Sequence, residues 1–306
     1  MISAFPDFSP LTLDDKDMYD SLVAKYPIYS DISFSTLHIW WNLEDKLKIS
    51  SLNNNLVFRY SQPFEPEDNG YCLVGKHEVD ESIETVFKFL RGQHMAVRLV
   101  HVPEFVVDAI KDKARFEITE EPDYHEYILD SHALSVLEGR DHWRNRGKIK
   151  RFLREVEGRQ IEIRSLELSS NEVKQDLIQN ILKWEKTRNK SNDPERTESQ
   201  AILNTINHAG KLNVENLSLY IDGVLNAVVL YHKSQDGKYF VIHHIKVDYS
   251  TPRIFDYMTH VLATKAKDDA VAFLNMEMDL GIESLREHKL GLRPVDFVKK
   301  YTISPA

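Results

Sequence analysis

The chain has 306 residues, of which 42% are hydrophobic and 10% aromatic, so it is long enough for two folded domains and too apolar for a disordered protein. Its formal net charge of −9 argues against nucleic-acid binding over the whole surface. The single cysteine, Cys72, excludes a disulfide framework and fits a reducing, cytoplasmic setting, and no apolar run approaches the roughly 20 residues of a membrane span.

The first half predicts short strands that alternate with helices. Ile83, Val86, Phe87 and Leu90 recur at helical spacing, and the run 53–55 of three asparagines is typical of a hairpin turn. In chain order we expect a strand at 11–13, helices at 14–26 and 33–41, strands at 46–51, 56–61 and 71–75, a helix around 83–90, a strand at 96–102, a helix at 104–113, and strands at 116–119 and 125–129.

The second half predicts the same order of elements. We expect a strand at 161–168, helices at 171–184 and 201–208, strands at 217–223, 226–233 and 238–247, a helix at 254–265, a strand at 272–279, a helix at 281–290 and a strand at 296–303. This is the order of the GNAT acyltransferase fold, an α/β (α+β) fold whose mixed sheet is flanked by helices and splayed between its fourth and fifth strands. We therefore predict two tandem GNAT-like units, at 1–158 and 159–306.

The stretch "NMEMDLGIESLREHK" (275–289) carries the first candidate site. On a strand, alternation would point Asn275, Glu277 and Asp279 to one side, at the carboxyl end where α/β sheets bind ligands. One interpretation is an ion-pair network that fixes the joint between strand and helix. The other is a site in which Glu277 or Asp279 takes a proton from an amine nucleophile. A metal site built on these two acids is weakly supported, because no histidine supplies a third ligand at a recognised spacing.

The helix after this strand adds two cations. Ile282, Leu285, Arg286 and Lys289 share one face, which places the two cations near the core, where unpaired charge is expensive. Arg286 and Lys289 either pair with the two acids or bind a phosphate or carboxylate. Tyr301, in the last predicted strand, is a candidate general acid, with packing as the alternative.

A basic stretch, "RDHWRNRGKIKRFLR" (140–154), departs from the acidic average. It has seven cations against one acid, a net charge of +6. Arg144, Arg146, Lys150 and Arg151 would bind donor phosphates of a tRNA, a CoA pyrophosphate or a lipid head group, with Trp143 available to stack on a base. A solvated helix face with Ile149, Phe152 and Leu153 packed inward is the equally weighted alternative.

The adjacent histidines His243 and His244 lie in a predicted strand, where alternation sends them to opposite faces. A structural role with satisfied hydrogen bonds is favoured for them over a catalytic base. No Walker A loop, Gly-x-Ser-x-Gly, His-Glu-x-x-His or Rossmann glycine pattern is present in the sequence.

The segment 274–301, with its Asn-x-Glu-x-Asp-Leu-Gly-Ile-x-x-Leu-Arg-x-x-Lys pattern, resembles the family of the phosphatidylglycerol lysyltransferase C-terminal domain, in its short, soluble bacterial form. The segment 123–152 and the opening "FSPLTLDDK" also fit this family. The resemblance implies kinship with Fem-type peptidyltransferases, a tandem GNAT-like fold, and transfer of an acyl or aminoacyl group to an amine on a small-molecule or peptidyl acceptor.

Two departures bear on the donor. Gly147 stands where the basic motif usually has asparagine, and no glycine lies between Lys246 and Ala272, where a CoA-dependent enzyme would place its pyrophosphate loop. Acyl-CoA is therefore the weaker candidate donor and aminoacyl-tRNA the stronger. The full lysyltransferases carry a membrane domain that this chain lacks, so lipid aminoacylation is not carried over. The competing function is a non-catalytic GNAT-like module that binds a nucleotide or peptidyl ligand.

Overall fold

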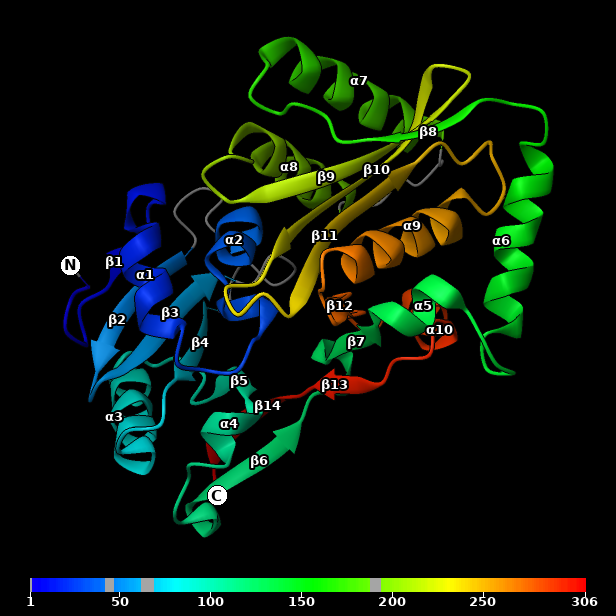
Figure 1. Ribbon diagram of the computed structural model, residues 1–306. Helices are drawn as coiled ribbons and strands as arrows, with labels where there is room; N and C mark the ends of the chain where they lie inside the picture. The colour runs from blue at the N-terminus through cyan, green and yellow to red at the C-terminus, as the bar shows by residue number, and fades with distance from the viewer. Residues whose placement is uncertain (1, 42–46, 62–68, 188–193) are drawn as a thin grey trace. The chain divides into compact units, whose positions relative to one another are not determined.

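The structure, a computed structural model, describes residues 2–41, 47–61, 69–187 and 194–306. It divides into two compact units, which we describe separately (Figure 1). The first unit comprises Met1–Glu126, Met278–Ile282 and Phe297–Ala306, and the second Tyr127–Glu277 and Glu283–Asp296. The predicted boundary near Gly158 falls inside the second unit, and the division into units at 1–158 and 159–306 stays a prediction.

The first unit contains two antiparallel sheets. One has the order β1-β2-β3-β4, and the other has the order β5-β14-β6, so β14 is its central strand. Its elements are β1 (Ser9–Pro10), α1 (Lys16–Val23), α2 (Phe34–Thr36), β2 (Leu47–Leu52), β3 (Asn55–Ser61), β4 (Asn69–Val74), α3 (Val79–Gly92), β5 (Leu99–Pro103), α4 (Glu104–Val107), β6 (Phe116–Glu120) and β14 (Lys300–Pro305).

Local sequence signals account for much of this unit. The hairpin between β2 and β3 turns at Asn53 and Asn54, whose φ angles are 49° and 59°, as the asparagine run predicted. The apolar stripe of α3 is buried as expected. The helix predicted at 104–113 is wrong beyond Val107, because the N–H groups of Lys111 and Asp112 donate to the carboxylate of Asp80, each at 2.9 Å, instead of continuing the helix.

The second unit is built on a seven-stranded mixed sheet with the order β13-β7-β12-β11-β10-β9-β8, in which β11 and β12 pair in parallel. Its elements are β7 (Glu126–Asp130), α5 (Ser131–Val136), α6 (Trp143–Glu155), β8 (Ile161–Arg164), α7 (Asn171–Thr187), α8 (Pro194–Asn207), β9 (Val214–Ile221), β10 (Val224–Lys233), β11 (Tyr239–Val247), α9 (Ile254–Asp268), β12 (Phe273–Asn275), α10 (Glu283–Gly291) and β13 (Asp296–Val298). The first residue of β7 and the last two residues of β13 are assigned to the first unit. Helix α9 packs against β10, β11 and β12 and against α5 and α6, whereas α7 packs against α8 and β11 (Figure 1).

The mixed α/β architecture and the predicted order of elements are confirmed in this unit, from β8 to α10. The order does not predict that two of the three sheets take in a strand from the other half of the sequence. β7 pairs antiparallel with β12, and β14 lies between β5 and β6. These two sheets are therefore complete only when both halves of the chain contribute to them, whereas the sheet β1-β2-β3-β4 is formed by the first half alone.

The parallel pair β11 and β12 separates after a short contact. Tyr239–Val241 pairs with Phe273–Asn275, but β11 continues to Val247 along β10 only. This separation is the predicted splay of the fourth and fifth strands.

Three predicted elements near the C-terminus are corrected. The strand predicted at 272–279 ends at Asn275, because Glu277 adopts a left-handed φ of 55°. The strand predicted at 296–303 is broken at Lys299 into β13 and β14. Helix α10 begins at Glu283. The predicted inward face is wrong for Ile282 and Leu285, whose exposed fractions are 47% and 38%, but Lys289 is buried as predicted. In the described part of the chain, no helix is both long and apolar enough to cross a bilayer.

Candidate functional site

Glu277 lies two residues beyond the end of β12, in a turn where both its backbone N–H and its backbone carbonyl form hydrogen bonds. Its N–H donates to the side-chain Oδ1 of Asn275 at 2.8 Å. Its carbonyl oxygen accepts from the backbone N–H of Tyr127 at 3.3 Å and from the ammonium group of Lys289 at 3.2 Å. A left-handed glutamate costs about 1 kcal/mol or more, and residues held in such conformations by their surroundings are concentrated at functional sites.

The side chain of Glu277 is held as well. Its Oε1 lies 3.1 Å from Nδ1 of His243, and Nε2 of that histidine lies 2.8 Å from Nδ1 of His232 on β10. The His243 side chain is fully buried and that of Glu277 is 11% exposed. Burial lowers the pKa of His243 to about 3, so its ring is neutral at physiological pH.

The two adjacent histidines lie at a β-bulge in β11. Leu230 pairs with His244 and Tyr231 pairs with Ile242, which leaves His243 as the extra residue of β11. His243 contacts Glu277, whereas Nε2 of His244 lies 3.1 Å from the hydroxyl of Thr205 on α8. The two rings thus have separate partners, and their predicted placement on opposite faces of the sheet stays a prediction. His232, which the sequence analysis did not single out, completes the row of polar side chains.

The predicted ligand-binding residues of this stretch have contacts of their own. Lys289 is buried on α10 and donates to the carbonyl oxygens of Met276 and Glu277, at 2.8 and 3.2 Å. Its charge also lies 5.6 Å from the ring centre of Tyr127. Arg286 is half-buried on the same helix. Asn275 and Lys289 therefore hold the turn that carries Glu277, and the role of Asn275, Arg286 and Lys289 in substrate binding stays a prediction.

Asp279 and Tyr301, the other predicted catalytic residues, lie in the first unit, whereas Glu277 lies in the second. Oδ1 of the buried Asp279 accepts the N–H of Gly281 at 2.8 Å, and Gly281 takes a φ of 72° in a sharp turn before α10. The hydroxyl of Tyr301 donates to Glu104 at 3.2 Å. Burial and the nearby carboxylate raise the pKa of Tyr301 to about 12, so this phenol keeps its proton at neutral pH. Its role as a general acid stays a prediction.

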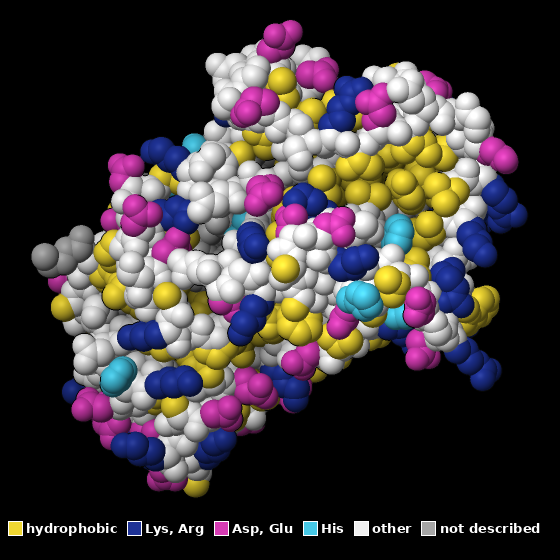
Figure 2. Space-filling model, viewed as in Figure 1, with side chains coloured by type: hydrophobic (Ala, Val, Ile, Leu, Met, Phe, Trp, Pro, Cys, Tyr) yellow, Lys and Arg dark blue, Asp and Glu magenta, His cyan; other side chains and the backbone are white. Residues whose placement is uncertain are grey.

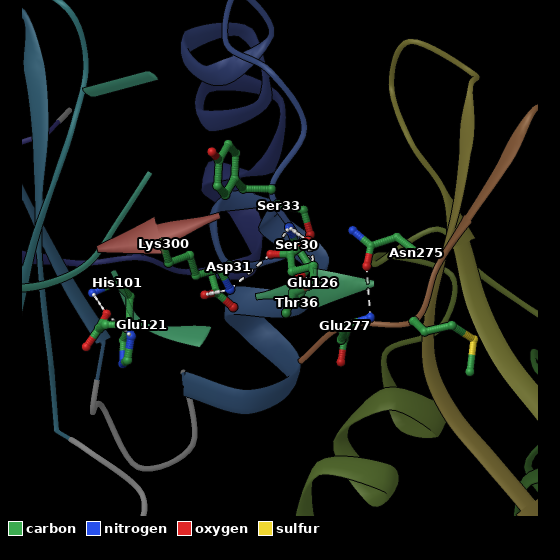
Figure 3. A network of polar contacts seen from close by, with 12 residues as sticks. Ser30, Asp31, Ser33, Thr36, His101, Glu121, Glu126, Asn275, Glu277 and Lys300 are labelled. Atoms are coloured by element: carbon green, nitrogen blue, oxygen red, sulfur yellow. Dashed lines mark hydrogen bonds and ion pairs between the residues drawn. The ribbon is translucent and has the colours of Figure 1, made fainter. Parts of the chain in front are cut away.

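A second buried network lies in the first unit and was not predicted. The ammonium group of Lys300 contacts Asp31 and, at 3.0 Å, Glu126, which also accepts the N–H of Ser30 at 2.9 and 3.0 Å (Figure 3). Burial alone would lower the pKa of Lys300, but the two carboxylates raise it above its ordinary value. The cavity beside Asp31 has a volume of about 20 Å³, enough for a water molecule and too small for an aminoacyl substrate. We regard this network as structural.

Helix α6 carries the predicted basic stretch, and its cations fall into two groups. Arg146 donates to the carbonyl oxygens of Leu137 and Gly139, and Lys148 forms a 2.8 Å ion pair with Asp256 on α9, so these two hold the helix in place. Lys and Arg side chains project along the outer side of α6 (Figure 2). The exposed cations of the stretch are Arg140, Arg144, Lys150, Arg151 and Arg154.

The inward side of α6 consists of Asn145, Ile149 and Phe152. Leu153, which was expected to pack inward, is instead 45% exposed, and Trp143 is 58% exposed with the Arg144 guanidinium 5.4 Å from its ring centre. The packed inner side and the exposed cationic outer side agree with the interpretation of a solvated helix face, except at Leu153, and phosphate binding by this helix stays a prediction. We call Arg144, Lys150, Arg151 and Arg154 the cationic face of α6. Among the described residues, no group of three His, Cys, Asp or Glu side chains is arranged to hold a metal ion.

Comparisons with known proteins agree with the resemblance seen in the sequence. A family model described as "Phosphatidylglycerol lysyltransferase, C-terminal" matches residues 70–304. No curated protein sequence matches the chain. Among solved structures, a conserved protein of unknown function from Bacteroides thetaiotaomicron is 22% identical, with 100% of both chains covered and a TM-score of 0.83.

Two further solved structures share the fold. L-PGS from Bacillus licheniformis is 15% identical, with 100% of this chain and 94% of that chain covered and a TM-score of 0.61. FemX is 10% identical, with 98% of this chain and 97% of that chain covered and a TM-score of 0.58. At these identities the likeness concerns the fold alone.

Proposed function

The chain belongs to the family of the phosphatidylglycerol lysyltransferase C-terminal domain, and from this premise we propose that it is an aminoacyltransferase, which moves an aminoacyl group from an activated ester to an amine acceptor. The family match includes Glu277, its histidine partners and α6. The fold shared with L-PGS and FemX supports the same class of reaction. For the finer fold proposal, two GNAT-like units, the separation of β11 from β12 supports the second unit alone.

The observation that carries the proposal is the fixed carboxylate of Glu277 at the splayed end of β12. A general base has to be ionised and held within hydrogen-bond reach of the proton that it takes. The Glu277 backbone is held by Asn275, Tyr127 and Lys289, and its side chain is held by His243. This degree of support from neighbouring residues is what a positioned catalytic group requires.

In the proposed reaction, the acceptor nitrogen attacks the ester carbonyl carbon of the donor, and Glu277 takes a proton from that nitrogen. The new C–N bond forms as the C–O bond to the donor alcohol breaks. Glu277 then returns the proton to the departing oxygen, so the products are an amide and a free alcohol, with no net change of protons. A positioned base of this kind contributes about 10²- to 10⁴-fold to the rate.

We assign donor binding to the cationic face of α6. Arg144 lies in the first turn of the helix, where the helix dipole favours anions, and Lys150 and Arg154 are like charges at i, i+4. Both arrangements weaken an isolated helix. Cations are kept at these unfavourable positions in a chain whose net charge is −9, and binding of a polyanionic ligand would explain why. The tRNA part of an aminoacyl-tRNA is such a ligand.

The start of α9 disfavours acyl-CoA. The residue that precedes this helix is Arg253, in a left-handed conformation with φ 64°. In the first turn, the Asp256 carboxylate lies 2.8 Å from Lys148 and 3.7 Å from Arg253. The cations at this position are therefore already matched by an acid, whereas a pyrophosphate needs unmatched donors.

The test is a transfer assay with tRNA charged with a mixture of tritiated amino acids. The acceptor is a short peptide with a free α-amine and a lysine side chain, and a parallel reaction contains anionic phospholipid vesicles. Mild alkali hydrolyses the remaining esters and leaves amides, so alkali-stable radioactivity in the peptide measures the proposed product. The variants are Glu277→Gln and, as the control, Glu287→Gln on the exposed side of α10.

We expect transfer to the peptide by the wild type and by Glu287→Gln, and a rate at least about 100-fold lower for Glu277→Gln with unchanged thermal stability. No transfer from any charged tRNA would overturn the aminoacyltransferase proposal and favour the binding module. Label in the lipid but not in the peptide would overturn the amine acceptor. Full activity of Glu277→Gln would overturn the role of Glu277.

A further inference from the structure

The polar side chains beside Glu277 form a continuous row across three neighbouring strands. Glu277 follows β12, His243 belongs to β11 and His232 to β10, and the two distances along the row are 3.1 and 2.8 Å. The two imidazole rings are nearly parallel, with an angle of 11° between their planes. The bulge at His243 is what turns this ring toward the end of β12.

The direction of the hydrogen bonds in this row follows from its chemistry. An ionised carboxylate only accepts hydrogen bonds, so Nδ1 of His243 has to donate to Oε1 of Glu277. Because burial keeps the ring neutral, His243 carries a single ring proton, and its Nε2 is then an acceptor. Nδ1 of His232 has to be the donor to that nitrogen. One carboxylate thus sets the tautomers of both histidines.

We propose that His243 and His232 are positioning residues for Glu277: His243 donates to Oε1 and keeps the carboxylate ionised and aligned, and His232 holds His243 in the tautomer that does so. This role rests on the proposed function, in which Glu277 is the base. Neither histidine touches the reacting atoms in this scheme. A histidine that orients a catalytic group through its second nitrogen is a recurring arrangement in enzyme sites.

The other charged and titratable groups around the row have partners of their own. His244 lies beside His243 on β11 and contacts Thr205, and Lys246 forms a 2.8 Å ion pair with Glu198. Lys289 contacts the backbone carbonyl of Glu277. His244 is buried like His243 and lies on the same strand, which makes it a matched control.

The first experiment reads the tautomers directly and does not depend on catalysis. The full-length protein is labelled with ¹⁵N-histidine, and long-range ¹H–¹⁵N spectra are recorded between pH 5 and 8, with signals assigned from His243→Gln and His232→Gln. We expect His243 to carry its single ring proton on Nδ1, and His232 to carry a proton on Nδ1 as well. In Glu277→Gln we expect the Nε2–H form of His243 to appear, because an amide both donates and accepts. A wild-type His243 protonated on Nε2, or on both nitrogens at pH 7, would overturn the inference.

The second experiment measures transfer rates against pH for His243→Leu, His243→Gln, His232→Leu and the control His244→Gln. Loss of a donated hydrogen bond raises the proton affinity of a carboxylate, so His243→Leu should move the acid limb of kcat/KM up by about one pH unit and lower kcat at least about tenfold, with KM within about threefold. In His243→Gln the acid limb should lie close to its wild-type pH, because the glutamine amide can donate a hydrogen bond to the Glu277 carboxylate. His232→Leu should shift the limb in the same direction by less.

A purely structural role would lower activity through unfolding without moving the acid limb, and His244→Gln should behave in that way. An acid limb that stays in place in His243→Leu would overturn the positioning role. The expected tautomers without any transfer activity would refute the proposed function and leave the hydrogen-bond assignment intact. Transfer activity together with the opposite tautomer of His243 would support the proposed function and refute the hydrogen-bond assignment.

Discussion

Neutralising the cationic face of α6 should weaken tRNA binding and should also make the remaining affinity less dependent on salt concentration. The variant changes Arg144, Lys150, Arg151 and Arg154 to glutamine and leaves Arg146 and Lys148 in place, because those two hold the helix by internal contacts. Each phosphate contact contributes about 0.7–0.9 to the slope of log K against log salt, so four contacts contribute about 3. Through these contacts alone, the wild type should lose roughly 50- to 150-fold in affinity between 50 and 200 mM KCl.

The assay is filter binding of labelled tRNA over that salt range. The matched control changes four cations that are exposed elsewhere in the second unit, Lys183, Lys186, Lys238 and Lys267, and so alters the net charge equally. We expect the α6 variant to lose about 3 from the slope and the control to lose less than about 1. Equal losses would show that only net charge matters, and an unchanged slope in the α6 variant would refute the assignment of donor binding to this helix.

Three further predictions concern stability. Lys300→Met should lower the free energy of unfolding in urea by about 3–5 kcal/mol, because it leaves two carboxylates without their buried cation. The control is Lys299→Met, which should change this free energy by less than about 1 kcal/mol, because the Lys299 side chain is 40% exposed. Equal losses of stability in the two variants would contradict a structural role for the Lys300 network. Gly147→Ala should raise the melting temperature by removing a helix cost of about 1 kcal/mol, because no neighbouring atom lies within 4 Å of the new methyl group, and a lower melting temperature would refute this. The pKa of His243 is about 3 in the folded chain and about 6.5 in the unfolded chain, so the unfolded chain binds more protons between these pH values. The free energy of unfolding of the wild type should therefore decrease as the pH falls from about 6.5 to about 3, and this residue contributes up to about 1.4 kcal/mol per pH unit. Urea unfolding at pH 4.5 and 7 should show a smaller difference for His243→Leu than for the wild type, and an equal difference would contradict the pKa assignment.

Local signals in the sequence predicted the elements that depend on local interactions. The buried stripe of α3 and the asparagine turn between β2 and β3 follow from spacing and backbone preference alone. The order of elements in the second unit was also predictable, because amphipathic period and turn residues mark each element. The family resemblance added the class of reaction, which no periodicity contains.

The details of the site depend on contacts that no local pattern encodes. Alternation fails after Asn275 because Glu277 takes a left-handed φ, held there by Tyr127 and Lys289, which are distant in sequence. The row of histidines depends on a bulge in β11. A polar His232 within the apolar run of β10 was the one visible signal. The Lys300 network had no signal, since its two acids lie 269 and 174 positions away.

The central place of β14 in its sheet affects how the protein is made. A ribosome has to synthesise Lys300–Pro305 before β5 and β6 acquire the strand that joins them. Until then two short strands in the N-terminal half have unpaired edges, a state that favours chaperone binding and aggregation over early folding. Removal of Lys300–Pro305 should therefore destabilise a sheet whose other two strands lie at residues 99–120.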